Sequence, residues 1–305
     1  MTVNRQCSSG LQAVATVAAA IQNGYYDIGI GGGVESMTQH YGPQALTMNV
    51  SEKILSYPPA ADCLLPMGLT SENVAAKFGI SRAKQDALAL ASHQKAAKAQ
   101  AQGHFRDEII PVKVQDESGG ERTIEADDGV RKDISLAALS KLKPVFKEDG
   151  TTTAGNSSQV SDGAAAVVLM KRKTAQQLGL PVLAKFVSFA VAGVPPHIMG
   201  IGPAFAVPEA VAKANVSIQD IDIVELNEAF ASQAVYCMEK LNLDPSKVNP
   251  KGGAIAFGHP LGCTGARQIA TLLPELRRQK KRLGVITMCI GTGMGAAAVI
   301  ENEML

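Results

Sequence analysis

The sequence is poor in aromatic residues and cysteine, and it has no tryptophan. Its 305 residues include 8 Phe, 5 Tyr and 5 Cys. Because the number of cysteines is odd and no two form a Cys-x-x-Cys pair, we expect neither a disulfide framework nor a zinc ribbon. A reducing compartment suits such a chain.

An excess of one charge and long apolar runs are also lacking. Lys and Arg total 29 against 28 Asp and Glu, which gives a formal net charge of +1. This balance predicts no general attraction to nucleic acid or anionic membranes. No run approaches the roughly 18 apolar residues of a spanning helix. We therefore expect neither nucleic acid nor a membrane as a partner.

Apolar and small residues are plentiful instead: 46% of the chain is hydrophobic and 29 residues are Gly. This composition suits a layered α/β enzyme with a sizeable core. A run of small apolar residues at 11–23 predicts a buried helix, and residues 27–33 predict a short strand that runs into a glycine loop. Further along we predict amphipathic helices near 71–78 and 82–102, a hydrophilic, strand-poor stretch at 116–131, and strands at 221–226 and 284–288.

A short repeat indicates two related halves. The sequence GAAAV at 163–167 recurs at 295–299, and the helix start at Gly10 resembles that at Gly265. These landmarks lie 153 residues apart in the first half and 30 in the second, so the first half has an insertion of about 123 residues. The predicted domains are an N-terminal half at 1–40 and 141–175, an inserted loop domain at 41–140, and a C-terminal half at 176–305.

The same comparison predicts a shortened first half. Only 9 residues precede Gly10, whereas 83 separate Val182 from Gly265. About 74 residues, enough for two or three strands and their helices, have no counterpart. We therefore expect an N-terminally truncated chain.

Cys7 stands directly before the first predicted helix. Unpaired N–H groups at a helix start lower the pKa of a thiol and favour the thiolate. The alternative is a buried cysteine that packs as a small apolar residue. Position alone favours the packing reading, so a catalytic role needs evidence from elsewhere in the chain.

Three C-terminal segments place polar residues after predicted strands or in glycine loops. Asn227 ends a strand, at the edge where α/β sheets bind ligands, or it is simply a turn residue. His259 lies in the loop GHPLGCTG and is either a base or a packed loop residue. Cys289 begins CIGTGMG, whose glycines admit a substrate close to the backbone.

Taken in order, RQCSSG at 5–10, NEAF at 227–230, GHP at 258–260 and CIGTGMG at 289–295 resemble the thiolase family. The nearer resemblance is to its peroxisomal 3-ketoacyl-CoA thiolase (acetyl-CoA acyltransferase) type, which LPMGLTSENV at 65–74 and AGNSSQVSDG at 154–163 also resemble. It covers essentially the whole chain. It implies a layered α/β/α/β/α fold of two similar βαβ-rich halves, the first incomplete.

The resemblance also implies roles for these residues. Cys7 would attack the 3-keto carbon of a 3-ketoacyl-CoA, with His259 as base and a water held by Asn227. Cys289 would protonate the acetyl-CoA enolate and then deprotonate CoA. The backbone N–H groups of Cys7 and Gly291 would stabilise the tetrahedral oxyanion.

Substrate contacts, partners and location follow from the same resemblance. Ser158 would contact the pantetheine arm, Arg131 the nucleotide of CoA, and Met67 the acyl pocket; as an alternative, Arg131 is a solvated loop charge. CoA and acyl-CoA are substrates, so we expect no cofactor and no metal. A homodimer in the peroxisome is expected, in the last step of fatty acid β-oxidation.

Two alternatives remain at this point. A condensing enzyme such as a ketoacyl synthase usually has His or Asn where this chain has Cys289, which favours a thiolase. The other alternative is a truncated, catalytically inactive thiolase fragment that binds CoA or a partner subunit.

Overall fold

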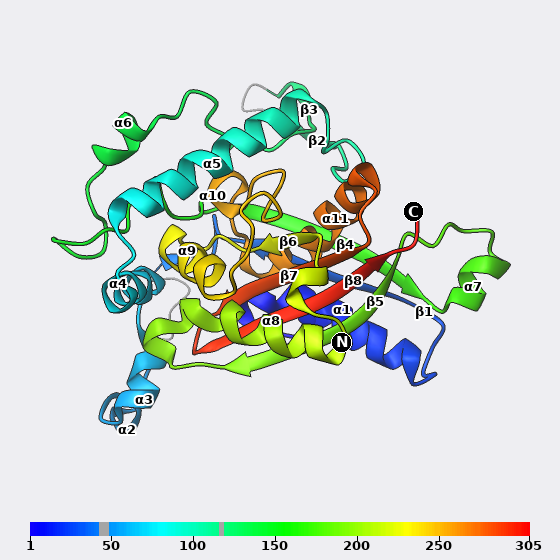
Figure 1. Ribbon diagram of the computed structural model, residues 1–305, viewed down its shortest axis with the longest axis horizontal. Coiled ribbons are helices and arrows are strands. Elements are labelled where there is room, and N and C mark those ends of the chain that lie inside the picture. Colours follow the sequence, from blue (N-terminus) through cyan, green and yellow to red (C-terminus); the bar gives the residue numbers. More distant parts are fainter. Residues whose placement is uncertain (43–48, 116–118) are drawn as a thin grey trace.

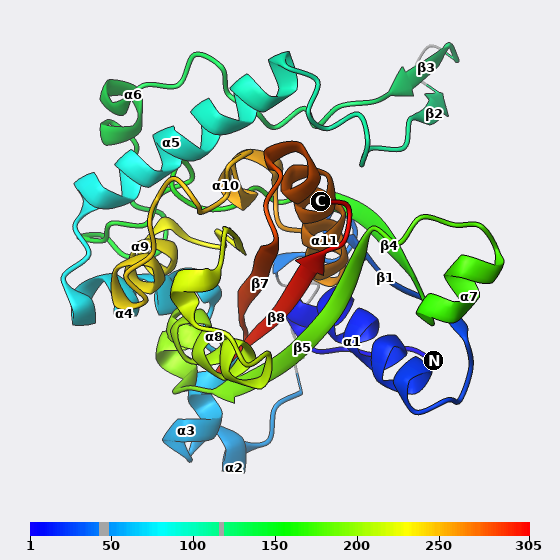
Figure 2. The same cartoon turned by 45° about the vertical axis from the view of Figure 1, so that its right-hand side comes forward.

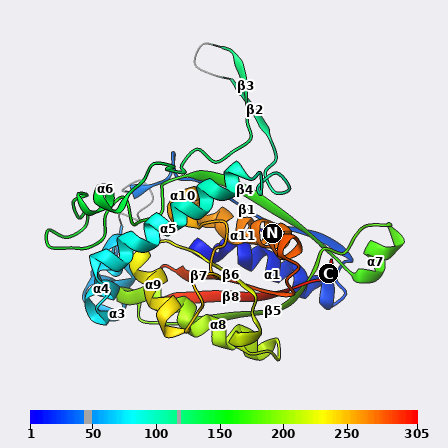
Figure 3. The same ribbon diagram turned by 45° about the horizontal axis from the view of Figure 1, so that its top comes forward.

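Two β-sheets with a pair of helices between them form the body of the protein. The computed structural model describes residues 1–42, 49–115 and 119–305. Figure 3 shows the layers in order: the strands β1 (Ile28–Ser36) and β4 (Asp162–Met170), the helices α1 (Ser9–Gln22) and α11 (Leu261–Gln279), a four-stranded sheet, and the helix α8 (Gly202–Lys213). The predicted α/β fold class is confirmed.

The four-stranded sheet has the order β5 (Ala184–Gly193), β8 (Met294–Asn302), β7 (Leu283–Ile290) and β6 (Ile223–Leu226). β6 and β7 run parallel, and the other neighbours are antiparallel. All eight residues of β7 are buried, because helices cover both faces of the sheet: α1 and α11 on one side, α8 and α9 (Ala231–Lys240) on the other. An apolar strand of this kind is typical of a sheet centre.

α1 and α11 approach so closely that side chains are excluded between them. A Cβ added to Gly10 would lie 2.7 Å from the carbonyl oxygen of Gly262, and one added to Gly265 would collide with the backbone of Leu11. These two glycines are the repeat landmarks found in the sequence. Their contact brings the N-terminal ends of both helices together.

β1 and β4 form an antiparallel pair whose inner face lies on α1 and α11. Ile30, Val34 and Val168 point outward and are exposed. The repeated GAAAV segments occupy equivalent strands, one in β4 and the other in β8.

Most of the described residues between β1 and β4 pack along one side of the body. α5 (Arg82–Ala101) runs beside α9 and α10 (Ala254–Phe257), and the hairpin of β2 (Val112–Gln115) and β3 (Glu121–Ile124) projects outward (Figures 1 and 2). The other helical segments are α2 (Glu52–Leu55), α3 (Pro58–Ala61), α4 (Met67–Phe78), α6 (Leu136–Ser140), α7 (Arg172–Gln177), η1 (Gln6–Ser8), η3 (Asp62–Leu64), η4 (Pro196–Ile201) and η5 (Ile218–Asp220). Within the described ranges, every helix is too short or too polar to cross a lipid bilayer.

Most predicted elements are confirmed, and two predictions are wrong. The expected glycine loop after residue 30 is the middle of β1, where Gly33 packs directly on the backbone of Gly262 and leaves no space for a side chain. The stretch at 116–131, whose first three residues lie outside the described residues, contains β3. Cross-strand pairing with β2 stabilises that strand despite its polar sequence.

Adding a methyl group between α1 and α11 should destabilise the protein. Alanine normally stabilises a helix interior relative to glycine, but Gly265→Ala places its Cβ against Leu11, and such overpacking costs about 1–3 kcal/mol. Urea unfolding measures the loss. Gly193→Ala is the control, because a Cβ there meets nothing within 4 Å. A Gly265→Ala protein as stable as the wild type would contradict this packing.

Candidate active site

The two predicted catalytic cysteines lie together in the interior. Cys7 is on η1, directly before α1, and Cys289 is near the end of β7. They are 6% and 0% exposed, and they lie close enough for Cys7 to raise the pKa of Cys289. Gly291 follows in the turn after β7, and its N–H faces the Cys7 sulfur. The structure therefore brings these three residues to one point.

Cys7 is a thiol at rest. Burial raises its pKa to about 11, although the backbone N–H groups of Gly291 and of Cys7 itself lower it. The N–H groups therefore act in the direction that the thiolate reading assumes, but burial outweighs them. The free-energy cost of removing a thiolate from water is larger than the stabilisation that the two N–H groups provide. Attack by this sulfur requires a base that takes its proton.

His259 has the properties of such a base. It is 4% exposed, and burial, together with the charge of Arg267, lowers its pKa to about 3, so the imidazole is neutral. Gly258 before it has φ +96°, and a Cβ there would collide with Ser161, so the loop needs glycine at this position.

Thr264 determines which nitrogen of His259 carries the proton. The Thr264 hydroxyl donates to the carbonyl oxygen of Pro260 at 3.0 Å and lies 2.6 Å from His259 Nδ1. The hydroxyl hydrogen is engaged, so Nδ1–H donates to Thr264 Oγ1 and Nε2 keeps its lone pair. Sequence reasoning missed Thr264, although it lies five residues after His259 in the same glycine loop.

Asn227 connects the histidine to the sheet. It follows β6, and its backbone N–H donates to the carbonyl oxygen of Thr287 on β7 at 2.9 Å. Its Nδ2 donates to His259 Nε2 at 3.2 Å. Its Oδ1 is buried and has no hydrogen-bond partner in the described part of the chain. A free acceptor of this kind is a binding position for a water molecule.

Glu228 holds the segment that carries Asn227, and sequence reasoning assigned it no role. Its buried carboxylate accepts from Ser92 Oγ and Asn249 Nδ2, both at 2.7 Å, and from the Ile255 N–H at 3.3 Å. Burial raises the pKa of this carboxyl, and these donors oppose the rise. α5, β6 and α10 are thereby joined behind the site.

Met67 and Ser158 lie beside this centre. Met67 packs with Cys289 in one apolar cluster, and its sulfur is near Gly291. The Ser158 N–H donates to the carbonyl oxygen of Ala229, two residues after Asn227.

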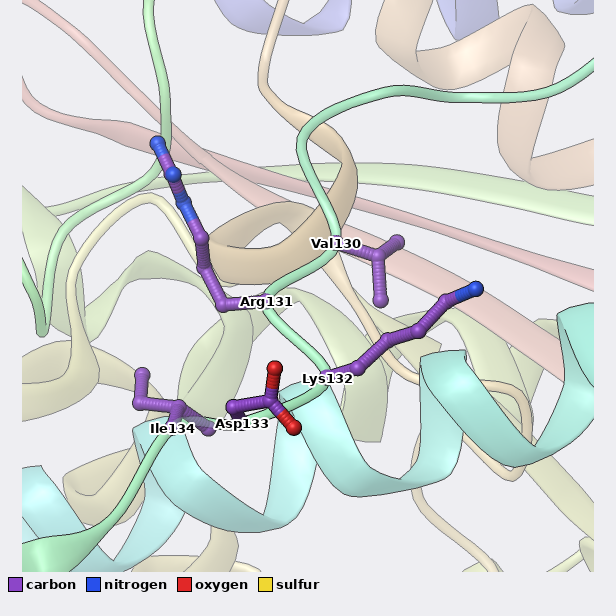
Figure 4. A pocket seen from close by; sticks show the side chains of 5 residues that line it. All are labelled: Val130, Arg131, Lys132, Asp133 and Ile134. Atoms are coloured by element: carbon purple, nitrogen blue, oxygen red, sulfur yellow. The ribbon is translucent and has the colours of Figure 1, made fainter.

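Arg131 lies elsewhere, in an open pocket of about 520 Å³. Its backbone N–H donates to His93 Nδ1, while its side chain is exposed. Figure 4 shows Arg131 and Lys132 extending to opposite sides of this pocket, whose other lining residues are Val130, Asp133 and Ile134. Gln159, next to Ser158, donates to the Gly129 carbonyl oxygen and so connects the two regions. Across the described ranges, no three His, Cys, Asp or Glu residues group as metal ligands.

Comparison with known proteins gives consistent matches over the whole chain. The N-terminal domain of thiolases matches residues 1–173 and their C-terminal domain matches residues 180–302. The peroxisomal 3-ketoacyl-CoA thiolase of Homo sapiens is 61% identical over 98% of this chain and 72% of its own length. The peroxisomal 3-ketoacyl-CoA thiolase 2 of Arabidopsis thaliana is 62% identical over 99% of this chain and 66% of its own length.

Solved structures agree with these matches. The dimeric peroxisomal thiolase of Saccharomyces cerevisiae superposes with a TM-score of 0.92 at 53% identity, over 99% of this chain and 75% of that one. Human mitochondrial 3-ketoacyl-CoA thiolase gives a TM-score of 0.90 at 39% identity, over 99% of this chain and 78% of that one.

The lowered pKa of His259 predicts an acid sensitivity that its substitution removes. An unfolded histidine has a pKa of about 6.5. Between pH 6.5 and about pH 3 the unfolded chain therefore binds a proton at this residue that the folded chain does not bind, and the free energy of unfolding decreases as the pH is lowered. From pH 7 to 5 the wild type should lose about 2 kcal/mol more unfolding free energy than His259→Asn. Urea unfolding at both pH values tests this, with the exposed His40→Asn as control. Equal losses in the wild type and His259→Asn would contradict a neutral, buried imidazole.

Proposed function

This chain belongs to the thiolase family, and we propose that it cleaves 3-ketoacyl-CoA with CoA to acetyl-CoA and a shortened acyl-CoA. Two observations support the proposal: the buried thiols of Cys7 and Cys289 lie together, and His259, in contact with Asn227 and Thr264, is a neutral imidazole whose Nε2 can accept a proton. One thiol can form an acyl-enzyme while the other transfers protons. That division of labour is what thiolysis requires.

In the first step, the Cys7 sulfur bonds to the 3-keto carbon and its proton passes to His259 Nε2. The bond between C2 and C3 then breaks, which leaves an acyl-Cys7 and the enolate of acetyl-CoA. The raised pKa of the thiol and the lowered pKa of the imidazole disfavour a thiolate–imidazolium pair at rest. The proton therefore moves as the sulfur attacks, when the new carbon–sulfur bond removes the thiolate charge.

Two sets of donors receive the negative charge that develops on oxygen. We infer that the N–H groups of Cys7 and Gly291, which both face the Cys7 sulfur, stabilise the tetrahedral oxyanion of acyl transfer. Asn227 Oδ1 is free to hold a water that, with His259, stabilises the first oxyanion. Loss of one such donor typically costs ~3 kcal/mol of transition-state stabilisation.

Cys289 completes the cycle. Its thiol protonates C2 of the enolate, and the resulting thiolate takes the proton of incoming CoA. The CoA sulfur then attacks the acyl-Cys7 carbonyl, and Cys7 leaves as a thiolate that takes its proton back from His259 Nε2. Cys289, rather than a second His or an Asn, at this position favours this reaction over that of a condensing enzyme.

Substrate binding is proposed along the line from Met67 to Arg131. Met67, in the apolar cluster with Cys289, contacts the acyl chain; Ser158, next to the Asn227 segment, contacts the pantetheine arm. Arg131 in its exposed pocket contacts the nucleotide. Both substrates bring their own CoA, so the reaction calls for no further cofactor.

The cellular setting follows from the relatives. The Homo sapiens and Arabidopsis thaliana proteins are named peroxisomal, and the Saccharomyces cerevisiae thiolase is named dimeric. The protein accordingly works in the peroxisome, in fatty acid β-oxidation, as a homodimer. These relatives are named as enzymes, and they lend no support to an inactive fragment.

Thiolysis by the purified chain tests the proposal directly. With CoA and a medium-chain 3-ketoacyl-CoA, the enolate absorbance should fall, and Cys7→Ala should abolish the reaction because no acyl-enzyme can form. Cys263→Ala is a matched control, since Cys263 is another buried thiol whose sulfur lies near Gly163 of β4 and which the proposed reaction does not use. A folded wild-type chain without activity, or an active Cys7→Ala, would refute it.

Thr264 should affect catalysis indirectly, because it sets the tautomer of His259. Thr264→Val removes the acceptor for Nδ1–H and allows the wrong tautomer, so kcat should fall roughly tenfold to a hundredfold, part of what a general base contributes. Thr264→Ser keeps the hydroxyl and should retain most activity. The expected loss lies in kcat with little change in KM. A Thr264→Val enzyme with wild-type kcat would show that this contact does not set the tautomer.

A further inference from the structure

The two cysteines of the site lie in different polar surroundings although both are buried. Cys7 faces two backbone N–H groups, its own and that of Gly291. At Cys289, the acting N–H is its own, and Gln233 Oε1 lies 3.9 Å from the sulfur. Donors favour a thiolate, whereas a carbonyl oxygen accepts a thiol hydrogen and repels a thiolate. The surroundings therefore separate the two groups chemically.

The backbone fixes the orientation of the Gln233 amide. Gln233 is 0% exposed on the first turn of α9, and its Oε1 accepts from the N–H groups of Ala229 at 3.0 Å and Phe230 at 3.5 Å. Its Nε2 has no close hydrogen-bond partner among the described residues, although the Gln233 side chain also lowers the pKa of the neighbouring Cys237 thiol. Turning the amide would direct NH₂ at two N–H donors, so the oxygen stays towards Cys289 even though the buried NH₂ is left without a close partner.

We propose that Gln233 is a positioning residue that keeps Cys289 a protonated thiol and so assigns nucleophilic attack to Cys7 and proton transfer to Cys289. This inference rests on the proposed function. When Cys289 gives its proton to C2 of the enolate, Gln233 Oε1 faces the resulting thiolate and destabilises it. The thiolate then readily takes the proton of incoming CoA, which restores the thiol and generates the attacking CoA sulfur.

Burial and two neighbouring thiols already raise the pKa of Cys289, and the Gln233 carbonyl oxygen at 3.9 Å acts in addition to them. Burial raises the pKa of Cys289 first, followed by Cys7 of η1 and Cys237 of α9, the titratable groups that act on it in the described chain. Both are themselves buried thiols with raised pKa values. The side chains packed against it from η4, α4 and the 227–230 segment are apolar: Met199, Met67, Ala229 and Phe230.

The test follows the alkylation of Cys289 by iodoacetamide as a function of pH, with modified peptides identified by mass spectrometry. A Cys7→Ser background removes the competing nucleophile. Gln233→Met removes the carbonyl while nearly keeping the volume, and the alkylation midpoint should fall by about one pH unit, which is about tenfold faster reaction below the midpoint. Gln233→Glu keeps an acceptor for both N–H groups but adds a negative charge, so the midpoint should rise.

Gln268→Met is the matched control. Gln268 is also buried with an unpaired amide atom, but it lies on α11 and donates to the Glu225 carbonyl oxygen. The Gln268→Met variant should leave the pH midpoint of Cys289 alkylation unchanged. A purely structural Gln233 would change thermal stability in Gln233→Met without moving the midpoint, and that result would overturn the inference.

Gln233→Glu keeps the test decisive if Gln233→Met does not fold, because it retains both helix-start bonds; an unchanged or lowered midpoint there would equally overturn the inference. Alkylation does not require turnover. Failure of the proposed function would appear separately, as absence of thiolysis by the wild-type chain.

Discussion

The contact between α1 and α11 is the constraint on which the site depends. Gly10 and Gly265 let the two backbones touch, and the N-terminal ends of the helices consequently meet beside the end of β7. Cys7 precedes one helix and His259 precedes the other, so two residues more than 250 positions apart reach the same place. Larger side chains at the helix contact would move the N-terminal ends of α1 and α11 apart, and Cys7 and His259 with them.

Burial then determines the resting charges. Away from water, both thiols keep their protons and the imidazole stays neutral, so the unliganded site holds no ion pair among its catalytic groups. Charge appears only as bonds to substrate change. Preorganised donors can stabilise that charge strongly because no solvent competes with them.

The residues around the catalytic groups show how far sequence reasoning reaches. Cys7, Asn227, His259 and Cys289 stood out because each lies beside a predicted strand or helix end. The structure joins Asn227 to His259 and places Cys7 close to Cys289. Thr264, Glu228 and Gln233 were not recognised, although two lie within quoted motifs. Their roles are hydrogen bonds to particular atoms, which residue order does not reveal.

The sequence by itself determined the α/β class, the thiolase resemblance, the helices α1, α4 and α5, and the strands β6 and β7, because these follow from local apolar patterns and short motifs. Tertiary structure alone decided that the glycines of β1 lie inside a strand, that β3 pairs with β2, and that Cys7 is a thiol. Each of these depends on what packs against the residue. Close backbone contact, cross-strand pairing and loss of water arise between distant segments, so no local pattern contains them.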